Sequence, residues 1–168
     1  MDAAPEAIVH PDGRLAFRGA VFRATIGARG VQSDKQEGDK ATPEGPLPLR
    51  RVLYRADRLP PPRCAVRLEP IAPDDGWCDD TSHPDYNRQI RLPHPARHEA
   101  LWRTDGIYDI IGVLGWNDDP VRPGRGSAIF LHVARPDYGP TEGCVALALA
   151  DLRWLLAAGL TELLVLPA

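Results

Sequence analysis

Prolines interrupt this chain so often that few helices can form in it. The 168 residues include 18 prolines and 15 glycines, and most of the prolines stand singly along the chain. A proline inside a helix removes a backbone hydrogen bond and clashes with the preceding turn, while both residue types favour tight turns. The pattern therefore predicts many short, stiff loops between strands, and a mainly β fold with few helices (α+β).

Apolar runs between these turns predict the individual elements. Residues 7–10 and 14–17 flank Pro11-Asp12-Gly13 and predict a hairpin, because Asp-Gly supplies the positive φ of a tight turn. One helix is predicted at residues 148–158, where leucines recur at helical spacing before Gly159. Further strands are predicted at residues 20–26, 47–54, 107–114, 127–132 and 163–166.

Two long segments separate the predicted strands. Residues 27–45 are polar and rich in turn residues, which is typical of a surface loop. Residues 55–103 contain eight prolines and predict an irregular proline-rich insertion packed over the core. Trp77 and Tyr86 indicate that this insertion is ordered, since disordered segments rarely carry large apolar groups. The length of the chain fits a single domain spanning residues 1–168.

The overall composition excludes several classes of protein. Hydrophobic residues make up 43% of the chain, charged residues 26%, and the net charge is -3. These values are ordinary for a globular protein and disfavour nucleic acid as a partner. No apolar run approaches the roughly 20 residues of a membrane span. Residues 1–10 lack the basic and apolar regions of a signal peptide, so either the protein is cytoplasmic or its export information is not encoded in this stretch.

The cysteine count leaves at least one thiol without a partner in the chain. There are three cysteines, and Cys144 is the candidate for the free one. Cys64 and Cys78 either form a disulfide in an oxidising compartment or are two buried thiols.

The segment with the clearest chemistry runs from Ser127 to Val145. An apolar run ends at His132, a Gly/Pro-rich loop follows, and Gly143-Cys144 comes next. An imidazole within reach of a thiol generates a thiolate–imidazolium pair, which is a good nucleophile. A strand-to-helix transition just after Cys144 would leave N–H groups free to bind an oxyanion. The alternative is a core histidine and a buried thiol with no catalytic role.

A zinc site is the competing hypothesis for the remaining histidines. His94 and His98 have the i, i+4 spacing of ligands on a helix, and His83, Cys78 and Asp79 lie upstream. Prolines on both sides of His94 argue against a continuous helix there. The sequence therefore predicts no metal site.

The segment His132…Thr141-Glu142-Gly143-Cys144-Val145 resembles the signature of the YkuD-type L,D-transpeptidases (ErfK/YbiS-like). The run from Gly38 to Gly45, GDKATPEG, is similar to the glycine, threonine, proline and glycine loop of the same family, which supports the cleft. The resemblance spans roughly the whole chain. It implies a β-sandwich or barrel with one helix after the cysteine.

Carried over to this chain, the resemblance implies that Cys144 is the nucleophile and His132 its base. Gly143 and the N–H of Cys144 would form the oxyanion site, while Thr141 and Glu142 would contact substrate. Glu142 stands where the family usually has histidine. Ala146 stands where it usually has arginine or asparagine, which leaves the specificity for the acyl donor open.

The chain also resembles proteobacterial members with GWCDD and YNR segments and a proline-rich insertion. The matching residues are Gly76-Trp77-Cys78-Asp79-Asp80, Tyr86-Asn87-Arg88 and Pro60-Pro61-Pro62. Some of that subgroup links L-alanine at the first stem position to diaminopimelate at the third. The resemblance thus raises this bond as an alternative to a link between two third positions.

The implied reaction transfers an acyl group between two peptidoglycan stem peptides through a thioester, without a cofactor. Tyr108, Arg125 and Arg135 are candidate contacts for stem carboxylates, the alternative being that the arginines are surface charges. The resemblance further implies a periplasmic location, a monomer and inhibition by carbapenems. Two other functions fit the same residues: a muropeptide L,D-carboxypeptidase or amidase that uses water as acceptor, and a non-catalytic wall-binding domain.

Overall fold

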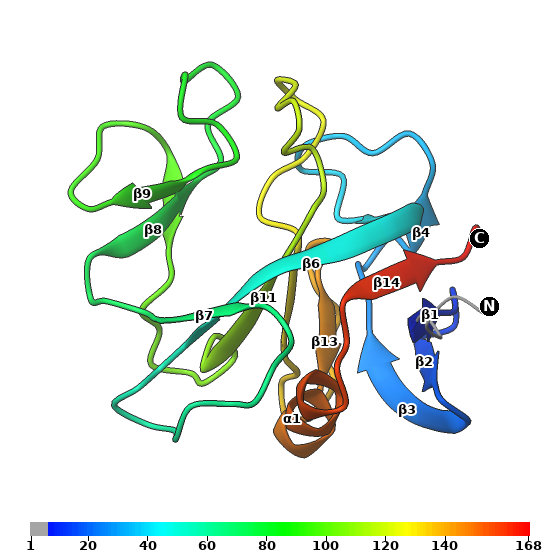
Figure 1. The fold of residues 1–168 in the computed structure, drawn as a ribbon. Coiled ribbons are helices and arrows are strands. Elements are labelled where there is room, and N and C mark those ends of the chain that lie inside the picture. Colours follow the sequence, from blue (N-terminus) through cyan, green and yellow to red (C-terminus); the bar gives the residue numbers. More distant parts are fainter. Residues whose placement is uncertain (1–6) are drawn as a thin grey trace.

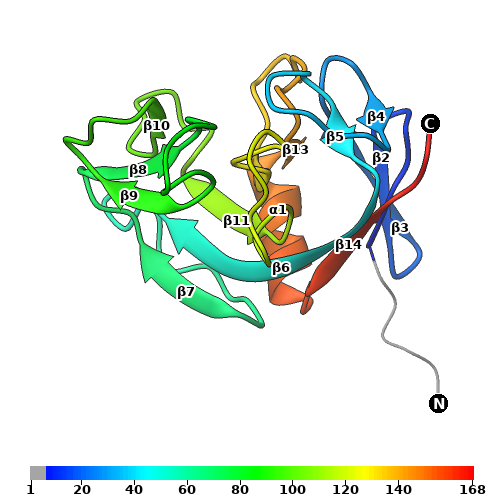
Figure 2. The same ribbon diagram turned by 90° about the horizontal axis from the view of Figure 1, so that it is seen from above.

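The computed structural model describes residues 7–168, which fold around one large curved sheet (Figures 1 and 2). The nine strands lie in the order β11-β12-β13-β3-β2-β1-β14-β6-β7. In chain order they are β1 (Ala7–Val9), β2 (Arg14–Phe17), β3 (Ala20–Thr25), β6 (Gly45–Tyr54), β7 (Arg67–Pro70), β11 (Ile110–Leu114), β12 (Phe130–Val133), β13 (Val145–Leu147) and β14 (Glu162–Val165).

The long strand β6 closes this sheet into a barrel. Its residues 45–48 pair with β14, and residues 49–54 pair with β11 at the other end of the strand order. The two ends of the sheet therefore meet on one strand, which runs across the molecule in Figure 1. The mainly β fold with one helix agrees with the fold expected from the sequence.

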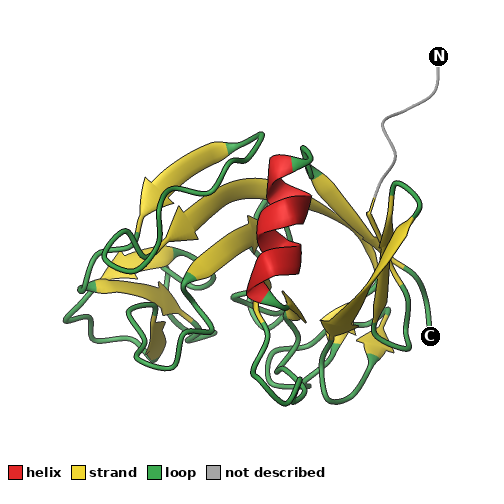
Figure 3. Cartoon of the chain, turned by 90° about the horizontal axis from the view of Figure 1, so that it is seen from below, coloured by secondary structure: helices red, strands yellow, loops and turns green. Residues whose placement is uncertain are grey.

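The single helix, α1 (Leu149–Ala157), packs against the inside of the curved sheet (Figure 3). Its buried residues Leu152, Leu155 and Leu156 join the core formed by the barrel strands. Gly159 has φ +96°, and its N–H donates to the carbonyl of Leu156, which ends the helix as predicted. No helix within residues 7–168 is long and apolar enough to cross a membrane.

Three predicted boundaries next to the predicted site are wrong. β11 begins at Ile110 because residues 106–109 form a turn, in which the N–H of Asp109 donates to the carbonyl of Gly106. β12 begins at Phe130 because Ala128 has φ +53°. A strand, β13, separates Cys144 from the helix, so the expected strand-to-helix transition does not directly follow the cysteine.

The insertion at residues 55–103 is more regular than the sequence predicts. β7 extends the large sheet beside β6, and three more strands form a separate small sheet in the order β10-β8-β9. They are β8 (Asp75–Cys78), β9 (Gln89–Arg91) and β10 (His98–Ala100). Figure 2 places this sheet at the end of the molecule away from β1–β3. The strands have three or four residues each, too short for an alternating pattern to reveal them between prolines.

The other long segment and the cysteines complete the comparison. Within residues 27–45, β4 (Val31–Gln32) pairs with β5 (Thr42–Pro43) inside an otherwise irregular loop. Cys64 and Cys78 are free thiols, so the disulfide alternative does not hold. Cys78 is fully buried in the core of the small sheet.

Candidate functional site

The parallel pairing of β12 with β13 brings His132 and Cys144 to the same side of the barrel. His132 lies opposite Ala146, two residues after the cysteine. Both predicted residues line one pocket of about 550 Å³. The remaining lining residues are Glu37, Gly38, Lys40, Asp79, Glu99, Arg103, Ile107, Tyr108, Ser127, Ala128, Arg135, Gly139, Pro140, Thr141, Glu142 and Ala146.

The thiol of Cys144 is buried and held by the segment just before β12. Its Sγ donates to the carbonyl of Ala128 at 3.2 Å and accepts the N–H of Phe130 at 3.3 Å. Burial raises the pKa of the Cys144 thiol to about 12. Neither of these two hydrogen bonds involves His132. The hydrogen of the thiol is instead donated to the carbonyl of Ala128.

The imidazole of His132 is fixed in one tautomer. Its Nδ1 lies 2.9 Å from the carbonyl oxygen of Val133, which can only accept, so Nδ1 carries the hydrogen. Nε2 is then the basic nitrogen, and the ring packs edge-on against Tyr108. Burial lowers the pKa of His132 to about 4. Both shifts favour a neutral thiol and a neutral imidazole at rest, whereas the sequence predicted a thiolate–imidazolium pair.

The turn at Thr141–Cys144 is held together by one hydroxyl. Thr141 Oγ1 donates to the carbonyl of Cys144 at 2.6 Å and accepts the N–H of Gly143 at 3.1 Å. The predicted substrate contact Thr141 thus has its hydroxyl engaged within the turn, and the N–H of Gly143 is not free for an oxyanion. In the described part of the chain, the N–H of Cys144 has no hydrogen-bond partner and is the available donor.

Residues 38–45 form part of the wall behind this turn. Gly143 has φ +137°, and a Cβ there would lie 2.7 Å from the carbonyl oxygen of Ala41. Thr42 is fully buried and its hydroxyl accepts the N–H of Gly27 at 2.9 Å. The loop therefore supports the turn that carries Cys144, as expected from its resemblance.

Besides Thr141, the sequence predicted four side chains that contact substrate. Three of them line the pocket, and one does not. Tyr108, Arg135 and Glu142 are lining residues. Arg125 is not among them; it pairs with Asp34 at 2.9 Å on the surface. The structure therefore places Arg125 in the surface role that the sequence left open as the alternative.

Sequence reasoning missed the contribution of the insertion to this pocket. Glu99 on β10 accepts the hydroxyl hydrogen of Tyr108 at 2.5 Å, and burial raises the pKa of the Glu99 carboxyl. Arg103 lines the pocket beside it and pairs with Asp105, whose pKa it lowers to about 2. No motif marks these residues, because their position depends on the β8–β10 pairing that the sequence did not reveal.

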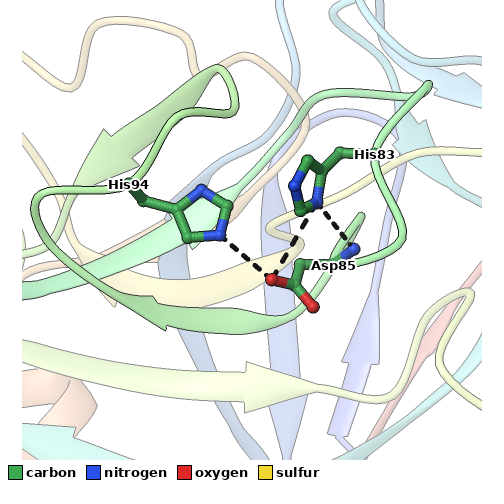
Figure 4. A group of neighbouring side chains, drawn as sticks. All are labelled: His83, Asp85 and His94. Atoms are coloured by element: carbon green, nitrogen blue, oxygen red, sulfur yellow. Dashed lines mark hydrogen bonds and ion pairs between the residues drawn. The ribbon is translucent and has the colours of Figure 1, made fainter.

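A second group of polar side chains lies in the insertion, outside this pocket (Figure 4). Candidate ligand atoms of His83, Asp85 and His94 lie within 4.8 Å of one another. Nδ1 of each histidine accepts a backbone N–H, from Asp85 and Ala96 respectively, so both rings carry their hydrogen on Nε2. Nε2 of His94 then donates to Asp85 at 3.0 Å. A metal ion would have to displace that hydrogen.

The histidine pair considered for zinc is arranged differently. His94 lies in a loop and His98 on β10, so they do not share a helix face. Nδ1 of His98 is bonded to the carbonyl of Ala96 at 2.8 Å.

Comparison with known families finds a match over the region that contains the pocket. The family model for the L,D-transpeptidase catalytic domain (YkuD) matches residues 6–161. No curated protein matches the chain. The matched region includes His132, Cys144 and the insertion.

Proposed function

We propose a catalytic activity for this chain, which belongs to the YkuD family of L,D-transpeptidase catalytic domains. The protein is a transferase that joins peptidoglycan stem peptides, with Cys144 as nucleophile and His132 as base. The observation that carries the proposal is that both residues line one pocket within the matched region. Since the family acts on the cell wall, we place the protein in the periplasm.

Because the thiol and the imidazole are both neutral at rest, the first step is a proton transfer between them. When a stem peptide enters, the thiol leaves the carbonyl of Ala128 and transfers its proton to Nε2 of His132. Sγ then attacks the carbonyl carbon of an L-centre, and the N–H of Cys144 stabilises the oxyanion. The C–N bond breaks, His132 returns its proton to the leaving amine, and a thioester remains.

The second step regenerates the thiol. The amine of a second stem attacks the thioester, loses a proton to His132, and forms a new amide as the C–S bond breaks. The proton on His132 then returns to Sγ. No oxidant, reductant or metal is needed for this exchange.

The charges around the pocket suit a zwitterionic stem. Arg103 and Arg135 offer guanidinium groups for a carboxylate, while Glu142 offers a carboxylate for an ammonium group. A link from L-alanine at position one to diaminopimelate at position three, and a link between two third positions, are separate outcomes of the test.

Mass spectrometry of muropeptides incubated with the wild type and with Cys144→Ala tests the proposal. We expect cross-linked dimers with the wild type only, and fragmentation of the dimers gives the bond position. Trimmed monomers alone would replace transfer with hydrolysis by a carboxypeptidase or amidase. Unchanged muropeptides, together with no covalent labelling of Cys144 by a carbapenem, would refute catalysis and leave a wall-binding domain. Fractionation that finds the native protein wholly in the cytoplasm would refute the periplasmic location.

A further inference from the structure

The segment that holds the Cys144 thiol at rest is itself held by the insertion. We propose that Asn87 is a positioning residue for the nucleophile: its side-chain amide fixes Ala128 in the left-handed conformation that directs the Ala128 carbonyl to Sγ. The role of Cys144 as nucleophile rests on the proposed function, but the placement of its thiol does not.

The side chain of Asn87 uses all its hydrogen-bonding groups in this arrangement. It is buried, and Oδ1 accepts from Nε1 of Trp77 at 3.0 Å and from the N–H of Ala128 at 3.1 Å. Nδ2 donates to the carbonyls of Trp116 and Asn117 at 3.0 and 2.9 Å. Two donors and two acceptors fix the orientation of the amide, so the oxygen facing Ala128 cannot turn away without breaking the other bonds.

Ala128 needs such a restraint. Its φ of +53° is a conformation that residues with a Cβ rarely adopt, and no glycine stands there to make it inexpensive. The segment 127–129 lies outside the strand ladder, because β12 begins only at Phe130. Asn87 therefore supplies the hydrogen bond that a neighbouring strand would otherwise give to the N–H of Ala128.

The restraint passes directly to the thiol. The N–H of Ala128 is bound by Asn87, and the carbonyl of the same residue accepts the hydrogen of Cys144 Sγ. If Ala128 relaxed to a negative φ, its peptide planes would rotate and the carbonyl would leave Sγ. A thiol that loses its acceptor no longer has its protonated form stabilised, so its pKa falls.

The other charged groups that act on Cys144 are separate from this link. Glu99 lies on β10, Lys35 in the loop 27–45, and Glu142 beside the cysteine. None of them takes part in the hydrogen bonds of Asn87. A substitution of Asn87 thus acts on the thiol through Ala128.

Alkylation of the folded protein by iodoacetamide at about pH 9, quantified for each cysteine by peptide mass spectrometry, tests the proposal without a peptidoglycan substrate. Loss of the hydrogen bond that stabilises the protonated thiol lowers the pKa of Cys144 by about one unit. Because the thiolate is the form that reacts, we expect Asn87→Ala to raise the alkylation rate of Cys144 about tenfold. The rate at buried Cys78, in the core of the same insertion, should stay unchanged. Rates that rise together at both cysteines would mean that the insertion has merely loosened, and would overturn the proposal.

Gln89 provides a matched control. It is another amide of the insertion, two residues away, and it bonds Asp75 and Arg51 but not the segment before β12. We expect Gln89→Ala to leave the Cys144 rate within about twofold of the wild type. An equal rise in both variants would refute a specific role for Asn87.

The pair Asn87→Ala and Ala128→Gly tests the route. Glycine adopts positive φ readily, so Ala128→Gly should bring the rate of Asn87→Ala back to within about threefold of the wild type. No recovery would show that Ala128 does not transmit the effect. If Asn87→Ala does not fold, Asn87→Gly removes the same amide without strain at the φ of +57° of this residue, and it should raise the Cys144 rate by about the same tenfold; a rate within about twofold of the wild type would count against the proposal.

Discussion

At the scale of single residues, His132 and Cys144 are neutral at rest because the same burial disfavours both charged forms. The thiol pKa is raised to about 12 and the imidazole pKa is lowered to about 4. In our proposal the ion pair forms only as substrate enters, when the thiol leaves Ala128. A buried imidazole also makes the fold sensitive to acid, because protonation of His132 favours the unfolded chain.

The first prediction concerns His132 and pH. Its pKa is lower in the folded chain than the ordinary value of 6.5, so the unfolded chain binds the proton more readily. The stability that this gives is fully present above about pH 6.5 and is lost as the pH falls towards about 4. Between about pH 7 and pH 4.5 we expect the wild type to lose roughly 2 kcal/mol more unfolding free energy than His132→Gln does. Urea denaturation of both proteins at the two pH values measures this difference. Equal losses would show that His132 is not the titrating group.

Residue types pointed to His132 and Cys144 as candidate site residues, and the structure brings both to one pocket. They did not indicate which other residues surround that pocket. Arg125 could not be assigned, since its pairing with Asp34 brings together residues far apart in the chain. Glu99 was missed for the same physical reason, because only the pairing of short strands carries it to the pocket.

At the scale of elements, the turn that carries Cys144 depends on the loop behind it. Gly143 faces the backbone of Ala41, and Thr141 holds the turn from within. The resemblance of residues 38–45 to the family's loop predicted this support, whereas composition alone indicated a surface loop. It did not predict the small sheet of the insertion, because strands of three or four residues between prolines show no readable alternation.

The second prediction tests this contact with Gly143→Ala. The new Cβ would lie 2.7 Å from the carbonyl oxygen of Ala41, at a φ of +137°. We expect a loss of about 3 kcal/mol in unfolding free energy, together with loss of acyl transfer, because the backbone of one segment must move. Gly124→Ala is the control: its φ is also positive, at +81°, but nothing lies within 4 Å of the new Cβ. That variant should lose only about 1 kcal/mol. Equal losses in urea denaturation would mean that the contact with Ala41 adds nothing.

At the scale of the whole molecule, the last strand connects two parts of the barrel sheet. β14 lies between β1 and β6, parallel to the first and antiparallel to the second. Leu163 and Val165 point into the core and are almost fully buried. The sequence predicted this strand from its apolar run, but not that it joins the two halves of the sheet, because strand order depends on contacts between distant segments. The match to the family ends at residue 161, before this strand.

The third prediction follows from this position of β14. A chain that ends at Thr161 loses the burial of Leu163 and Val165, worth about 1.5–3 kcal/mol each, and leaves the edges of β1 and β6 unpaired. Because a domain of this size has a total stability of about 5–15 kcal/mol, we expect this chain to lose its cooperative thermal transition. Removing only Pro167 and Ala168, which are exposed, keeps β14 and the hydrogen bond from Leu166 to Val9, so the transition should stay within a few degrees of the wild type. Calorimetry of the two chains separates the outcomes, and a cooperative transition in the chain ending at Thr161 would show that the barrel closes without β14.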